Sequence, residues 1–125
     1  MLGYANIGTN DLDRALAFYD KVLGVLGGKR LFPMPEGRGH FYGGGEGAMV
    51  AVCKPYDGKA ATGGNGSMFA LTCPDRATVD EVYKAAMDAG ATCEGEPGER
   101  MPVFYGAYFR DLDGNKLCAF KMETG

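Results

Sequence analysis

The chain has 125 residues, the size of one ordinary domain, and a hydrophobic fraction of 46%, which is enough for a packed core. Its formal net charge of −3 argues against nucleic acid or an anionic membrane surface as a partner. No apolar run reaches the roughly 18 residues of a membrane helix, and the opening residues, MLGYANIGTND, lack the features of a signal peptide. We therefore expect a cytoplasmic protein that does not enter a membrane.

The first half of the chain predicts a strand, a helix and three further strands. A short apolar strand lies within 4–11, and apolar residues then recur at three- and four-residue steps over 11–24. Asp11 is in place to cap this helix at its N-terminus. Alternating apolar segments predict strands at 29–33, 38–43 and 48–53.

The second half repeats this order after a polar, glycine-rich linker at 55–66. An offset of 64 residues places 4–11 on 68–75 and Tyr19 on Tyr83. A second helix is expected at 75–89, with strands at 91–95, 104–109 and 116–120. We expect each of the two matched tyrosines to anchor its helix on a sheet, with the hydroxyl reaching the surface.

The two halves together predict an α+β domain made of two tandem βαβββ modules, module one at 1–54 and module two at 67–125. The helical crossover implies that the first strand of each module lies parallel to a later one. The four cysteines have no CxxC spacing, so they are interpreted as buried small hydrophobic residues rather than as a zinc site.

Three segments carry a resemblance to a known family: NDLDRALAFYDKVLG (10–24), PDRATVDEVYKAAMDAGA (74–91) and FYGAYFRDLDGNKLCAF (104–120). With the opening strand they make the chain similar to the vicinal oxygen chelate superfamily, which includes glyoxalase I, bleomycin-resistance proteins and extradiol dioxygenases. The closing segment resembles the family ending DPDGN-x-[IL]-E. The resemblance implies curved mixed sheets around a shared concave cavity.

Metal-dependent members of this family place ligands on the first and last strands of each module. The resemblance puts these positions on Tyr4, Ala51, Met68 and Cys118, where the usual imidazole and carboxylate groups are missing. Divalent cations prefer those groups, so we expect no metal and no cofactor. The single histidine, His40, lies outside the quartet.

Strand alternation indicates which side chains face the cavity. If Tyr4 points inward, so does Asn6, and Met68 is its repeat partner; on the last strand Cys118 and Phe120 point inward. This lining is largely apolar and suits a small apolar or flat molecule. The alternative is that these side chains simply fill the cavity.

Two polar segments have ordinary structural interpretations beside functional ones. Arg38, His40 and Tyr42 share a strand face and could meet an anionic ligand at the cavity mouth, although a polar surface strand is the simpler explanation. The turn DLDGN (111–115) resembles the start of a calcium loop, but its glycine comes too early. It is better interpreted as a hairpin turn whose side chains bond their own backbone.

The resemblance implies a metal-free small-molecule-binding protein similar to bleomycin-resistance members, and a homodimer, because family members of this length commonly pair. Two alternatives stay open: a glyoxalase- or dioxygenase-like enzyme with an atypical site, and a purely structural or interaction module. The candidate ligand-binding residues are Tyr4, Asn6, His40, Ala51, Met68, Cys118 and Phe120.

Overall fold

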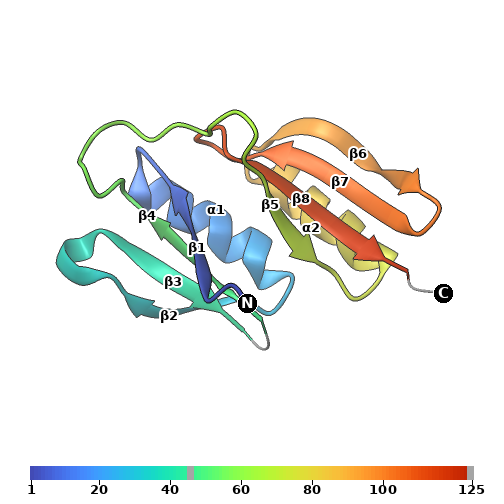
Figure 1. Cartoon of the computed structure of the whole chain (residues 1–125), viewed down its shortest axis with the longest axis horizontal. Coiled ribbons are helices and arrows are strands. Elements are labelled where there is room, and N and C mark those ends of the chain that lie inside the picture. Colours follow the sequence, from blue (N-terminus) through green and yellow to red (C-terminus); the bar gives the residue numbers. More distant parts are fainter. Residues whose placement is uncertain (45–46, 124–125) are drawn as a thin grey trace.

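The computed structural model describes residues 1–44 and 47–123. The elements, in chain order, are β1 (Tyr4–Gly8), α1 (Leu12–Gly24), β2 (Lys29–Pro33), a short 3₁₀ helix η1 (Pro35–Gly37), β3 (Gly39–Gly43), β4 (Met49–Cys53), β5 (Phe69–Thr72), α2 (Arg76–Asp88), β6 (Thr92–Met101), β7 (Phe104–Arg110) and β8 (Lys116–Met122). The strands form two four-stranded sheets, and Figure 1 shows the two βαβββ modules side by side. The predicted fold class is confirmed.

The sheets have the same topology, with strand orders β1-β4-β3-β2 and β5-β8-β7-β6. In each module the first strand pairs in parallel with the last, and the remaining pairs are antiparallel. The parallel pairs follow from the helical crossovers, as predicted. Strand β6 is longer than the predicted 91–95, because bulges accommodate its glycines and proline while it continues to pair with β7.

Both helices begin at capping aspartates. The Asp11 carboxylate accepts a hydrogen bond from the Arg14 backbone N–H at 3.2 Å. Asp75 accepts from the Thr78 backbone N–H at 2.8 Å and from its hydroxyl at 2.6 Å. Such caps satisfy backbone donors that have no partner inside the helix. In the part of the chain that the structure describes, neither helix is long and apolar enough to cross a membrane.

One hydrophobic core joins the two modules. Ile7 and Val52 of the first sheet and Phe109 and Leu117 of the second belong to the same buried cluster as the apolar faces of α1 and α2. The two helices also pack against each other. The opposite side of each sheet, which we call the helix-free face, is not closed over by the other module within one chain (Figure 1).

A polar junction also links the modules, at the turn between β7 and β8. One Asp111 carboxylate oxygen accepts hydrogen bonds from the Tyr19 hydroxyl at 2.5 Å and from the Asn115 side-chain amide at 2.9 Å. The other accepts from the backbone N–H groups of Asp113 and Asn115, each at 2.9 Å. The turn does bond its own backbone, as predicted. The expectation that the Tyr19 hydroxyl reaches the surface is wrong: the residue is 1% exposed, and its hydroxyl donates to Asp111.

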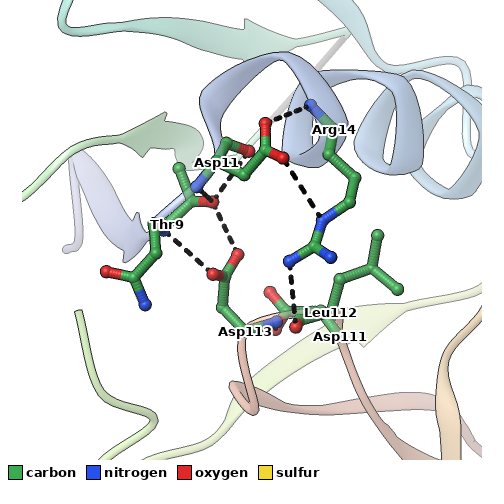
Figure 2. A network of polar contacts seen from close by, with 7 residues as sticks. Thr9, Asp11, Arg14, Asp111, Leu112 and Asp113 are labelled. Carbon is green, nitrogen blue, oxygen red and sulfur yellow. Dashed lines mark hydrogen bonds and ion pairs between the residues drawn. The ribbon is translucent and has the colours of Figure 1, made fainter. Parts of the chain in front are cut away.

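The same turn also contacts the start of α1 (Figure 2). Asp113 accepts hydrogen bonds from the Thr9 hydroxyl at 2.6 Å and from the Asn10 backbone N–H at 2.9 Å. The Asn115 amide donates to the Gly8 carbonyl at 2.9 Å, and Arg14 donates to the Leu112 carbonyl at 3.4 Å. The DLDGN turn therefore fixes module two on module one.

Candidate functional site

The helix-free face of the first sheet carries three of the predicted site residues. Asn6 and Phe41 both lie beside Ala51 in register. Tyr4 is 49% exposed and meets the Phe41 ring edge-on, with centroids 5.0 Å apart, and Phe32 lies 4.8 Å from Phe41 on its other side. Ala51 itself is fully buried, in a small cluster with Met34 and Cys53. This face therefore presents a group of aromatic rings, and the region around Ala51 is filled by packed side chains.

Two more predicted residues lie on the helix-free face of the second sheet. Cys118 is placed beside Ala70 and Tyr108, whereas the flanking Leu117 and Ala119 belong to the core under α2. Two positions along the strand, Phe120 stacks on Phe104 with centroids 5.3 Å apart. The alternation predicted for β8 is thus present, but the Cys118 residue is fully buried.

The surroundings of Cys118 determine its protonation state. Burial raises the pKa of the thiol, while the Tyr108 hydroxyl and, more weakly, Arg100 and Lys116 lower it, and the net shift is upward. Both cations lie over the Tyr108 ring, Arg100 at 5.5 Å and Lys116 at 5.6 Å from its centroid. A buried thiol with a raised pKa stays protonated at neutral pH and is a poor nucleophile and a poor metal ligand.

The positions that the family resemblance assigns to a metal do not fit one. Ala51 has no donor atom, and Tyr4 and Met68 offer only a phenol and a thioether. Cys118 is buried in the other sheet from Tyr4 and Ala51. Across residues 1–44 and 47–123, no three His, Cys, Asp or Glu side chains are grouped so that they could hold an ion. The donor set at these positions therefore does not support a divalent cation.

The structure separates His40 from the other predicted site residues. Its strand places it on the helix side, the same side as Tyr42, whose hydroxyl donates to Asp20 of α1 at 2.7 Å. The reason is register: Gly39 pairs with Cys53, so the even-numbered residues of β3 face α1. The His40 Nδ1 atom is buried and has no hydrogen-bond partner among the described residues. His40 is thus away from the helix-free face.

Met68 lies just before β5, 45% exposed, at a groove between the modules. The groove has a volume of about 650 Å³ and a largely apolar lining, with Leu23, Leu26, Val50, Phe69 and Leu71 among its residues. It lies on the side of β1 and β4 that faces α1. Met68 therefore lines a different hollow from Asn6.

Two smaller hollows lie at one end of module one, where β4 leads into the linker. Their volumes are about 360 Å³ and 290 Å³, and they share Arg38, Lys54, Pro55 and Ala60. Asn6 and Cys53 line the second of them. The linings of these two hollows and of the groove contain neither Ala51 nor Cys118. The linker residues were missed by the sequence analysis, although KPYDGK shows two lysines around an aromatic ring.

Comparison with known proteins agrees with this architecture. Residues 1–119 match the family model described as Glyoxalase/Bleomycin resistance protein/Dioxygenase superfamily. The chain belongs to this superfamily. Among curated protein sequences no match is found.

Solved structures of the superfamily are similar over almost the whole chain. A glyoxalase/bleomycin resistance protein from Albidiferax ferrireducens T118 is 34% identical with a TM-score of 0.86, over 97% of this chain and 98% of that one. A superfamily member from Sphaerobacter thermophilus DSM 20745 is 28% identical with a TM-score of 0.69, over 97% and 96% of the two chains. A lactoylglutathione lyase from Agrobacterium tumefaciens is 24% identical with a TM-score of 0.70, over 97% and 92%, and that likeness shows the fold alone.

Proposed function

We propose that this superfamily member binds a small apolar or flat molecule without using a metal, as a bleomycin-resistance-type binding protein rather than as a glyoxalase- or dioxygenase-like enzyme. The observation that carries the proposal is the state of two family ligand positions. Ala51 is a buried methyl group, and Cys118 is a buried, protonated thiol under Tyr108. Ala51 has no donor atom, and the raised pKa of Cys118 disfavours the thiolate that would bind a divalent cation.

The side chains on the helix-free faces support an apolar ligand. Tyr4, Phe32 and Phe41 form one aromatic group, and Phe104 and Phe120 form another. Flat rings such as these favour stacked or edge-on contacts with a planar molecule. Asn6, exposed on β1, would supply a directional polar contact at the edge of the first group.

Exposed apolar side chains support a homodimer. Several large apolar side chains are between 42% and 54% exposed in the single chain: Tyr4, Leu31, Phe32, Met68, Met101, Val103 and Met122. Large apolar side chains that lie together on a surface often mark an interface or a binding site. A two-fold partner that placed its second sheet over the first sheet of this chain would close a cavity between the two aromatic groups. We place the protein in the cytoplasm, where its four free thiols would stay reduced.

Metal analysis and binding of a neutral flat probe test this proposal. Protein purified from cells supplied with Ni, Zn, Mn and Fe should carry no stoichiometric metal, and N-phenyl-1-naphthylamine should bind with saturable fluorescence. Tyr4→Ala should weaken probe binding, while Tyr83→Ala, on the face of α2 that packs against the core, should not. A metal bound to each chain and lost on Cys118→Ser would establish the enzyme alternative instead. A sedimentation mass of one chain at micromolar concentration would contradict the dimer.

A further inference from the structure

We propose a second binding site, for the oxyanion of a small molecule, in the hollow between the end of the β3–β4 pair and the linker. The side chains of Arg38, Lys54 and Lys59 would bind the ligand, which would carry a carboxylate or a phosphate monoester. The site is built by residues outside the aromatic groups of the helix-free faces, so it stands whether or not those faces bind an apolar molecule.

Strand pairing brings the first two cations together. Gly39 pairs with Cys53, and the Lys54 backbone N–H donates to the Arg38 carbonyl at 2.9 Å, so Arg38 and Lys54 are cross-strand neighbours just beyond the ladder. The close approach requires glycine at position 39, because a Cβ there would collide with the Val52 carbonyl oxygen. Like charges placed opposite each other are destabilising. A bound anion would relieve this repulsion.

The Arg38 guanidinium is available for a ligand. Four of the six arginines of the chain, Arg14, Arg30, Arg76 and Arg110, form ion pairs with nearby acids. Within the described residues no hydrogen bond or ion pair engages the Arg38 guanidinium, which lies over the Tyr56 ring at 5.3 Å from its centroid. Stacking on an aromatic ring holds the planar guanidinium while leaving its N–H groups free for a bidentate contact with an oxyanion.

The hollow is predominantly cationic and has a fixed outline. Arg38, Lys54 and Lys59 line the larger part against one acid, Glu36, and the adjoining part adds Asp57, whose carboxylate is occupied by the Lys59 backbone N–H at 2.9 Å. The cations thus outnumber the acids in a chain whose net charge is −3.

Hydrogen bonds of the Asn10 side chain hold the linker side of the hollow in place. The Asn10 amide anchors the linker by accepting from the Ala61 backbone N–H at 2.7 Å and donating to the Ala61 carbonyl at 3.1 Å. Glu36 has φ +61°, an unfavourable conformation for a residue with a side chain, at the rim of the hollow. Such strain is concentrated at functional sites. The walls of the hollow are therefore built before any anion arrives.

Titration of the full-length ¹⁵N-labelled chain with sodium phosphate, sodium acetate and sodium chloride, at constant ionic strength, tests the site. Phosphate or acetate should cause saturable chemical-shift changes confined to the backbone amides of 36–38, 54 and 56–60 and to the Arg38 Nε–H, and chloride should not. Tighter binding of phosphate would assign the site to phosphoryl groups, and tighter binding of acetate to carboxylates. Arg38→Met should weaken binding about tenfold, as expected for loss of a charge-assisted bidentate contact.

Matched variants separate a specific site from general charge. Arg100→Met removes a second arginine that lies over a tyrosine and that forms no ion pair with another described residue, and it should leave anion affinity unchanged. Lys54→Met, an exposed position after β4, should weaken binding even if Arg38→Met perturbs the fold. The proposal would be overturned if chloride caused the same chemical-shift changes as phosphate and acetate, or if neither Arg38→Met nor Lys54→Met changed the anion affinity.

Discussion

Replacing Asp111 by alanine should destabilise the protein more than any other single polar substitution at the junction between the modules. The side chain is 6% exposed and accepts four hydrogen bonds, from the Tyr19 hydroxyl, the Asn115 amide and two backbone N–H groups. Without the carboxylate, the Tyr19 hydroxyl and the Asn115 backbone N–H become buried donors with no partner. Each orphaned donor costs roughly 1–3 kcal/mol, so we expect a loss of roughly 3–5 kcal/mol in the free energy of unfolding.

Urea unfolding followed by circular dichroism, at one protein concentration, measures this loss. Tyr19→Phe alone should cost roughly 1–2 kcal/mol, because Asp111 keeps its other donors. The double substitution should cost less than the sum of the two single ones by roughly 1 kcal/mol or more, since the residues are in direct contact. Tyr83→Phe is the control at the repeat-related position and should change stability by less than about 0.5 kcal/mol. A cost below roughly 1 kcal/mol for Asp111→Ala, or strict additivity with Tyr19→Phe, would refute the junction as a source of stability.

Three further outcomes follow from burial and pKa. Cys93 is the one exposed thiol of the four, so one thiol of the native protein should react quickly with Ellman's reagent and the other three only after unfolding. Fast reaction of a second thiol in the native protein would contradict the packing. Burial raises the pKa of both Tyr19 and Tyr42, so the stability that they contribute is complete below about pH 10 and is lost above it, because the unfolded tyrosines ionise first. The urea concentration at the midpoint of unfolding should therefore decrease as the pH is raised from about 9 to about 11, and the decrease should be smaller in Tyr19→Phe. The hydrogen bond from Arg30 is the main cause that lowers the pKa of Asp20, so the stability that the pair contributes is present above about pH 4 and is lost as the pH falls. Because the pair is exposed, Arg30→Met should lower the free energy of unfolding at about pH 7 by less than about 1 kcal/mol and should not change it in acid; a larger loss at neutral pH would show that the pair is not screened.

The elements that the sequence predicts correctly are those with local causes. Both helices are specified by apolar residues at three- and four-residue steps and by an aspartate at the cap, and both begin within one residue of the expected position. The βαβββ order and the parallel pairing of β1 with β4 follow from the repeat and from the crossover rule. These features depend on contacts between residues close in sequence, or on chain connectivity.

The features that the sequence could not supply depend on register and on distant contacts. Tyr19 and Asp111 are 92 residues apart, and the sequence around neither residue indicates that the Tyr19 hydroxyl is buried against Asp111. The side of the sheet on which His40 lies is set by the pairing of Gly39 with Cys53, and a shift by one residue would reverse it. The hollow at Arg38 needs the linker folded back on β1, through the amide of Asn10.

The two modules differ in the connection between the last two strands of each sheet. In module two the β7–β8 connection, 111–115, is a polar turn that bonds to the start of α1. The equivalent β3–β4 connection shows only Gly44, Gly47 and Ala48 among its described residues, and these line the apolar groove beside β5. Hydrogen bonds between the modules are thus concentrated at one end, where Thr9 and Asn10 contact both the turn and the cationic hollow. Because a binding site needs walls that keep their positions, the end fixed by the Asp111 junction is the one on which a small oxyanion can be held in a defined orientation.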